Sequence, residues 1–145
     1  MIALIQRVSE ASVSIEGVTR AAIGPGLLAL IGIVSGDDSA SAQRLLERVL
    51  GYRVFSDREG RMNLDLREQG GALLLVPQFT LAADTRSGTR AGFSRAAEPA
   101  RARPLFDELV RLAQAAHPRV GSGEFGTHMQ VRLLNDGPVT FWLES

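Results

Sequence analysis

The chain has 145 residues, with sixteen arginines against sixteen acidic residues and neither lysine nor cysteine. This length predicts one domain, residues 1–145, with a core of its own. The lack of cysteine excludes disulfides, thiolate metal ligands and a cysteine nucleophile, and the zero formal charge argues against a general nucleic-acid binder. No apolar run reaches the roughly 18 residues of a membrane span and no signal-peptide pattern is present, so we expect a cytoplasmic protein without membrane contact.

The first third of the chain carries strand and turn signals and then a helix signal. Residues 2–8 and 11–17 each read as a short strand, and residues 24–26 mark a turn before a uniformly apolar strand at 27–34. Helix-capping residues follow, and four apolar residues then recur at helical spacing: Leu45, Leu46, Val49 and Leu50. We therefore predict a helix with one buried face in this region.

The rest of the chain is predicted to place further strands around a second helix. Residues 56–65 read as a turn with a short strand, and residues 71–84 as one long apolar strand. A helix follows Glu98, with Pro104 in its first turns and an inner apolar face: Leu105, Phe106, Leu109, Val110 and Ala113. The chain then ends in a loop and a hairpin around residues 135–138.

Strands come mainly in consecutive runs and do not alternate one-to-one with helices. This order favours an α+β fold. We predict a curled, largely antiparallel, barrel-like sheet with two main helices.

The sequence contains no well-known catalytic or cofactor-binding motif in the structural context that such a motif requires. GSGEFG, residues 121–126, matches the dinucleotide fingerprint, but a helix precedes it and a strand follows it, so we read it as a loop. The histidines, His117 and His128, have neither a metalloprotease spacing nor a cysteine neighbour, which argues against a metal site. No G-x-S-x-G elbow is present either. A hydrolase with this sequence would not use the usual side-chain nucleophile.

Two polar residues, Gln78 and Thr80, follow a buried apolar run and share one face of a strand at period two. Polar groups at the end of a core strand need hydrogen-bond partners, or they face a site. From these residues alone, a satisfied strand end and a functional site are both possible readings.

Arginine is concentrated between residues 86 and 103. Five arginines in this stretch accompany a single acid, Glu98; they are Arg86, Arg90, Arg95, Arg101 and Arg103. A local excess of four positive charges suits phosphate contacts, for which the planar guanidinium is well shaped. The alternative is a solvated loop and helix start in an arginine-rich chain.

The stretch NDGPVT, Asn135 to Thr140, raises a similar choice. Asn, Asp and Gly tolerate the φ angles of a tight turn, but Pro138 gives up a backbone donor just where a returning strand should begin. A cis bond before proline is found at only about 5–6% of such positions. The segment is either an ordinary hairpin tip or a rigid piece of backbone that contacts something.

Four stretches together resemble the D-aminoacyl-tRNA deacylases: QRVSEASV, MNLD, PQFTLAADTRSGTRAGF and FGTHMQVRLLNDGPVTFWLES. The likeness runs in register from Met1 to Ser145, and the last two stretches are specific to that family. It implies a homodimeric enzyme, without a cofactor, that hydrolyses the ester linking a D-amino acid to the 3′ end of tRNA. It also implies removal of glycine from mischarged tRNA.

The resemblance assigns a catalytic segment and a selectivity segment. The family's Ser-Gln-x-Thr motif places Gln78, Phe79 and Thr80 at the ester, with backbone N–H groups of Phe79 and Thr80 as oxyanion donors and the RNA's own 2′-hydroxyl handling the proton. The family's Gly-cisPro motif falls on Gly137 and Pro138. In the family it reaches into the partner's pocket, so the active sites lie at the subunit interface.

Weaker assignments concern the rest of the RNA. On this resemblance Met129 and Phe93 line the adenine pocket, and Arg7, Arg86 and Arg90 contact tRNA phosphates.

The sequence departs from the family pattern at two points. The motif's serine is Pro77 here, so a hydroxyl at that position is not required, and the usual Arg-Pro-Ser-Phe appears as residues 90–93, Arg-Ala-Gly-Phe. Pro77 and the arginine-bearing loop motivate one alternative, a non-catalytic tRNA-binding dimer. A small-molecule esterase in a dimer cleft is a third hypothesis.

Overall fold

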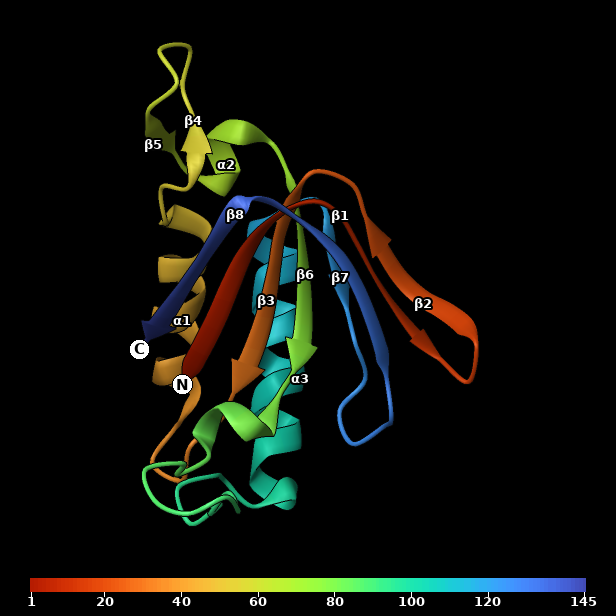
Figure 1. Cartoon of the computed structure of the whole chain (residues 1–145), viewed down its shortest axis with the longest axis vertical. Coiled ribbons are helices and arrows are strands. Elements are labelled where there is room, and N and C mark those ends of the chain that lie inside the picture. Colours follow the sequence, from red (N-terminus) through yellow and green to blue (C-terminus); the bar gives the residue numbers. More distant parts are fainter.

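Strands from both halves of the chain form one curled sheet, described for residues 1–145 by a computed structural model (Figure 1). Across the sheet the strand order is β2 (Val18–Ile23), β1 (Ile2–Ile15), β3 (Gly26–Gly32), β6 (Ala72–Pro77) and β7 (Val120–Ser122), and β8 (Gln130–Glu144) pairs with β1. All pairings of β1 are antiparallel. The prediction of a curled sheet with two main helices is confirmed.

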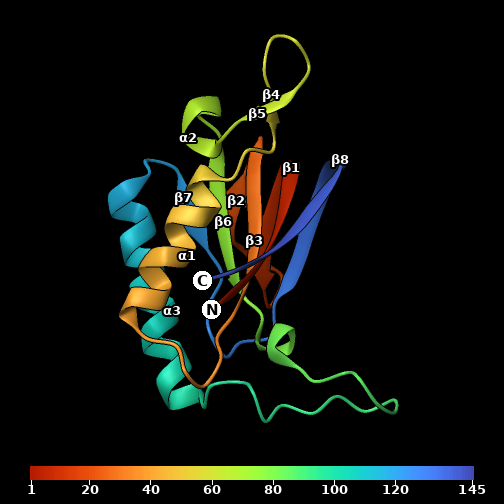
Figure 2. The ribbon, with the colours of Figure 1, turned by 90° about the vertical axis from the view of Figure 1, so that its left-hand side faces the viewer.

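The sheet is nevertheless mixed, because the β3–β6 and β6–β7 pairs are parallel. Parallel neighbours need a crossover of about a dozen residues or more, usually helical. Helix α1 (Ser39–Gly51) lies in the first crossover and α3 (Pro99–Ala116) forms the second. Both helices therefore cover the same face of the sheet, as Figure 2 shows.

Three small elements complete the chain. The short strands β4 (Phe55–Ser56) and β5 (Met62–Leu64) pair as a separate hairpin, followed by the one-turn helix α2 (Leu66–Gln69). A 3-10 helix, η1 (Phe79–Ala82), follows β6. None of the helices is both long and apolar enough to cross a membrane.

Two breaks between strands that the sequence predicted are absent from the structure. Strand β1 is one strand of 14 residues, not the two short strands predicted from the sequence. Strand β8 is likewise one strand of 15 residues, so the hairpin predicted around residues 135–138 is wrong. The ladder between β8 and β1 is irregular at two neighbouring points: residues 136–139 bulge out opposite a single residue, Arg7, and Ser9 has no partner between Val8 and Glu10. A bulge lets one strand absorb extra residues while both of its arms keep the same partner.

The predicted long strand at residues 71–84 is divided in two. Strand β6 ends at Pro77, which has no N–H to continue the ladder, and η1 begins at Phe79. The N–H of Gln78 donates to the carbonyl of Ile31 at 2.7 Å and closes the sheet at this end. The tight turn then carries the following residues away from the sheet.

Apolar side chains fill both faces of the sheet, because successive residues of a strand point to opposite sides. On the helix-covered face the main cluster takes alternate residues of β3 and β6, namely Leu27, Ala29, Ile31, Leu73 and Leu75. On the other face a second cluster contains Val8, Val13, Leu28, Leu74 and Val76. Burial of each large aliphatic side chain contributes about 1.5–3 kcal/mol.

Both predicted helices bury the residues expected of them, except that Val110 of α3 is only half-buried. The side chain of Asp38 caps α1 by accepting the Ser41 N–H at 2.8 Å. Pro104 is the sixth residue of α3, in its second turn, and the helix gives up one N–H donor there. The buried positions are Leu45, Leu46, Val49 and Leu50 in α1, and Leu105, Phe106, Leu109 and Ala113 in α3.

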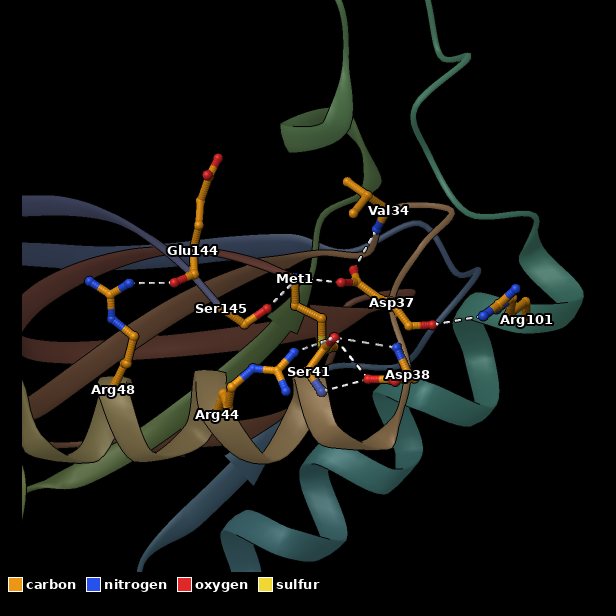
Figure 3. A network of polar contacts seen from close by, with 10 residues as sticks. All are labelled: Met1, Val34, Asp37, Asp38, Ser41, Arg44, Arg48, Arg101, Glu144 and Ser145. Carbon is orange, nitrogen blue, oxygen red and sulfur yellow. Dashed lines mark hydrogen bonds and ion pairs between the residues drawn. The ribbon is translucent and has the colours of Figure 1, made fainter.

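The two ends of the chain meet beside the start of α1 (Figure 3). The buried ammonium group of Met1 lies 2.5 Å from Oδ1 of Asp37 and donates to Oγ of Ser145 at 2.7 Å. Asp37 also accepts the N–H of Val34 at 2.7 Å, and its carbonyl accepts a hydrogen bond from Arg101 at 3.0 Å. This buried ion pair therefore ties β1, the turn before α1, α3 and the end of the chain together.

Candidate active site

A cavity of about 700 Å³ opens at the carboxyl end of β6. Its walls come from the end of β6 and the start of η1, from the chain that enters α3, and from the connection between β7 and β8. Ligand sites of sheets with parallel strands lie preferentially at the carboxyl ends of those strands. The parallel part of the sheet, which the sequence did not predict, thus places the cavity.

The rim of the cavity carries the polar pair noted in the sequence. Nε2 of Gln78 lies 2.5 Å from Oγ1 of Thr80, and Gln78 and Phe79 line the cavity itself. The pair meets through the 3-10 turn and not through strand alternation. Because Phe79 and Thr80 begin η1, their N–H groups have no partner within that helix. An amide, a hydroxyl and two backbone donors are therefore grouped at one edge.

An aromatic and thioether surface forms the apolar part of the cavity. The rings of Phe79 and Phe93 lie 5.1 Å apart at a tilt of 46°, and both are unusually exposed for phenylalanine, at 56% and 43%. Met129 lines the same cavity. A Cβ at Gly123 would lie 2.8 Å from Sδ of Met129, so glycine leaves room for this side chain. Exposed ring faces beside a cavity are suited to stacking on a nucleobase.

Several lining residues were not assigned to this cavity from the sequence. Glu98 and Arg103 come from the start of α3, and Phe125 and His128 from the β7–β8 connection. The guanidinium of Arg103 lies 5.4 Å from the ring centre of Phe125, within the range of a cation–π contact. The sequence showed Phe125 only as part of a glycine-rich loop, and only the fold brings it to α3. No three His, Asp or Glu side chains converge as metal ligands.

Gly137 and Pro138 do not line this cavity. Both are exposed in the bulge of β8, and the peptide bond between them is cis. The φ angle of Gly137 is +147°, where residues with a side chain are disfavoured. A Cβ there would also lie 2.6 Å from Cγ2 of Val139 and 3.2 Å from Nη2 of Arg7. The conformation and the crowding both require glycine.

Arg7 and Asn135 anchor the bulge. Nε of Arg7 donates to the carbonyl of Asp136 at 2.8 Å, and Nη1 donates to the carbonyl of Val54 at 2.5 Å. Oδ1 of Asn135 accepts the N–H of Val139 at 2.7 Å and closes the other end. The Arg7 side chain is only 15% exposed. Its guanidinium is thus directed at the protein's own backbone.

The two other arginines expected at phosphates lie elsewhere, in the extended connection between η1 and α3 (Figure 2). Nη2 of Arg86 lies 2.6 Å from Oδ2 of Asp84, and this side-chain contact holds the pKa of Asp84 below its usual value. Arg90 is exposed and forms no ion pair within the chain. The structure therefore keeps Arg86 and Arg90 in one loop and separates Arg7 from them.

Comparisons with known proteins identify the family. The family model described as D-Tyr-tRNA(Tyr) deacylase matches residues 4–144. The chain is 66% identical over 144 residues to the D-aminoacyl-tRNA deacylase of Thioalkalivibrio sulfidiphilus, covering 99% of this chain and 97% of that one. It is 61% identical over 145 residues to the D-aminoacyl-tRNA deacylase of Azotobacter vinelandii, covering 100% of both. The chain is a hydrolase and belongs to the D-Tyr-tRNA(Tyr) deacylase family.

Solved structures share the fold over the whole chain. The c-Myc DNA Unwinding Element Binding Protein superposes with a TM-score of 0.95 at 32% identity, covering 100% of this chain and 99% of that one. A probable eukaryotic D-amino acid tRNA deacylase superposes with a TM-score of 0.88 at 16% identity, covering 99% and 98%, and this likeness concerns the fold alone.

Proposed function

We propose that the chain hydrolyses the ester bond of D-aminoacyl-tRNA and that the cavity at the end of β6 is its active site. Membership of the D-Tyr-tRNA(Tyr) deacylase family supports the reaction. The observation that carries the site is the convergence of Gln78, Phe79, Phe93 and Met129, from three separate segments, on one cavity. The 3′-terminal adenosine occupies the cavity, and the ester lies at the rim formed by Gln78 and Thr80.

The reaction on this substrate needs no strong nucleophile in the protein. An aminoacyl ester is already activated, so positioning and stabilisation of the developing negative charge suffice. The N–H groups of Phe79 and Thr80, unpaired within η1, donate to the oxyanion of the tetrahedral intermediate. The Gln78 amide and the Thr80 hydroxyl hold the terminal ribose and the ester. The 2′-hydroxyl of the RNA handles the proton, and no cofactor takes part.

The adenine base binds against the apolar wall. Phe93 and Met129 line the cavity and offer a ring face and a polarisable thioether. Stacking of a base on an aromatic side chain contributes about 1–3 kcal/mol and does not depend on the base. These contacts therefore bind the end of any tRNA and leave selectivity to the amino acid.

Selection for the D-amino acid follows from which direction at Cα is blocked. With the ammonium and the ester carbonyl of the substrate fixed, a D-residue directs its hydrogen where an L-residue directs its side chain. A wall at that position rejects every L-amino acid, whereas glycine, with two hydrogens, passes. We assign this wall to the backbone of Gly137 and Pro138, which Arg7 and Asn135 hold by hydrogen bonds. Glycyl-tRNA is then a second substrate.

The wall belongs to the partner subunit of a homodimer. Gly137 and Pro138 are exposed and lie outside the cavity of their own chain, so a second copy must bring them to it. The same strand exposes Val131, Leu134 and Trp142, at 36%, 58% and 49%. Large apolar side chains gathered on one exposed strand are typical of a surface that another protein covers. The active sites thus lie at the subunit interface.

The roles that we propose for Arg7, Arg86 and Arg90 depend on where each of them lies. Arg86 and Arg90 remain candidates for phosphate contacts from the exposed loop, although Asp84 already neutralises Arg86. Arg7 acts as a positioning residue for the bulge, because its Nε and Nη1 donate to backbone carbonyls and its side chain is mostly buried. The enzyme is expected in the cytoplasm, where charged tRNA is used.

The proposed function is tested by incubating the protein with D-tyrosyl-tRNA, L-tyrosyl-tRNA and glycyl-tRNA. The wild type should release D-tyrosine and glycine but not L-tyrosine. Equal release of D- and L-tyrosine would refute the selection mechanism. Binding of tRNA without any release would favour the non-catalytic tRNA-binding dimer, and undiminished hydrolysis of free D-tyrosine esters would favour a small-molecule esterase. Sedimentation velocity on the same samples tests the homodimer.

A further inference from the structure

A second groove of about 420 Å³ adjoins the cavity along α3. It is walled by the outer side of α3, by β2 and by the chain that follows β7. Arg103 and Phe125 line both the cavity and the groove, so the two hollows adjoin at these two side chains. Neither the reaction nor the selection mechanism uses this groove.

Three arginines line the groove. Arg103 and Arg111 are eight residues apart on α3, about 12 Å along the helix axis, and they lie on the same side of the helix. Arg20 reaches the groove from β2. None of the three forms an ion pair within the chain, in contrast to Arg86 and its neighbour Asp84. Their guanidinium groups are therefore available to an anionic ligand.

Two carboxylates, Asp107 and Glu124, line the same groove, and they too form no ion pair within the chain. They offset part of the positive charge that a free inorganic anion would meet in the groove. A ribose–phosphate backbone offers both partners, because its phosphates accept hydrogen bonds from arginine and its 2′-hydroxyls donate to carboxylates. The mixture of charges fits an RNA strand better than it fits DNA or a simple anion.

We propose that the groove on α3 binds the backbone of the RNA strand whose last nucleoside fills the cavity. Arg103, at the junction, contacts the phosphate next to the terminal adenosine, and Arg111 and Arg20 contact phosphates further from the 3′ end. This proposal rests on the proposed function for the direction of the strand. It assigns the approach of the tRNA to α3 and β2, and not to the arginine loop between η1 and α3.

The test uses the double variant Arg20→Gln/Arg111→Gln, because both residues line only the second groove. The probe is a fluorescent single-stranded RNA that ends in CCA, titrated between about 50 and 200 mM salt. Binding weakens as salt rises, and each lost phosphate contact makes the slope of log K against log salt shallower by about 0.7. The loss of two contacts should therefore make it shallower by about 1.4. At about 0.1 M salt the same exponent gives roughly 25-fold weaker binding.

The matched control removes two arginines from outside both hollows, Arg53→Gln/Arg58→Gln, and should leave both the affinity and the slope unchanged. A double variant at Arg20 and Arg111 that binds the RNA with the wild-type slope would overturn the proposal. So would a control that loses as much affinity as that variant, since the effect would then be general charge. A DNA probe of the same sequence should bind the wild type more weakly than the RNA does; equal binding would also count against the proposal.

Hydrolysis separates failure of this proposal from failure of the proposed function. The Arg20→Gln/Arg111→Gln variant should hydrolyse D-tyrosyl-adenosine, which lacks the preceding phosphates, at the wild-type rate, and D-tyrosyl-tRNA with a raised KM. Equal losses on both substrates would overturn the groove assignment. If the wild type hydrolyses neither substrate, the proposed function fails, and the salt slope of RNA binding still decides whether the groove binds RNA.

Discussion

Replacement of Arg7 by methionine should release the bulge of residues 136–139 from its support. In the wild type, Arg7 donates to the carbonyl of Asp136 at 2.8 Å and to the carbonyl of Val54 at 2.5 Å. Methionine fills much of the space of the arginine stem but has no hydrogen-bond donor. The substitution therefore removes the two hydrogen bonds and the charge while it keeps most of the packing.

The size of the effect follows from where the two carbonyls lie. Val54 is fully buried and its bond to Arg7 is partly buried, so loss of the donor leaves an acceptor poorly hydrated, which costs about 1–3 kcal/mol. The bond to Asp136 is exposed, and water replaces the donor there at a cost of about 0.5–1.5 kcal/mol. Together the free energy of unfolding should fall by roughly 2–4 kcal/mol, a large share of the 5–15 kcal/mol typical of a domain.

Urea denaturation followed by circular dichroism measures the stability, and hydrolysis of D- and L-tyrosyl-tRNA measures the function. Under the proposed function the folded variant should lose D-tyrosyl-tRNA hydrolysis or gain L-tyrosyl-tRNA hydrolysis, because the wall is no longer held in place. Arg132→Met is the control, since Arg132 is exposed in the same strand and forms no ion pair; it should change stability by less than about 0.5 kcal/mol. Wild-type stability and wild-type selectivity in the Arg7 variant would show that the anchoring role is wrong.

Three further predictions concern the fold. Gly26→Ala should destabilise the protein by about 3 kcal/mol or more, because its Cβ would lie 1.9 Å from a β6 carbonyl oxygen, whereas Gly24→Ala, with nothing within 4 Å, should fold normally in thermal denaturation. Asp37→Asn leaves a buried ammonium without its counter-charge and should cost about 3 kcal/mol or more in urea denaturation; a loss below about 1 kcal/mol would contradict the pairing. A hydrogen bond from the N–H of Arg61 holds the pKa of Asp57 below its usual value. The ionised Asp57 carboxylate therefore stabilises the β4–β5 hairpin above the unfolded-state pKa, and this stabilisation is lost as pH falls through the lower folded-state pKa. An NMR titration of Asp57 with a midpoint at or above the unfolded-state pKa would contradict this prediction.

The elements with strong local patterns were predictable from the sequence. The two helices followed from apolar residues at helical spacing and from capping residues such as Asp38, and the structure buries Leu45 and Leu109 as expected. The apolar runs that became β3 and β6 were equally clear. These signals are local, because a helix or strand imposes its period on neighbouring residues whatever they later contact.

Strand continuity and strand direction were not predictable in the same way. The sequence around residues 8–11 reads as a break between two strands, and NDGP reads as a hairpin tip. In the structure β1 continues, and β8 absorbs residues 136–139 as a bulge because both of its arms pair with β1. That pairing joins residues between 116 (Ser14 and Gln130) and 142 (Ile2 and Glu144) positions apart, and no local period reports it.

For the site, the sequence supplied the residue types at the rim, Gln78 and Thr80, and through resemblance the family. The tertiary structure decided that Phe125 and Arg103 join them at one cavity, that Arg7 is directed at its own backbone, and that the groove of Arg20 and Arg111 adjoins that cavity. The physical reason is that composition and periodicity fix which face of an element is apolar, whereas the meeting of surface groups depends on how whole elements pack. A cavity wall is made by segments that pack side by side without sharing any local pattern.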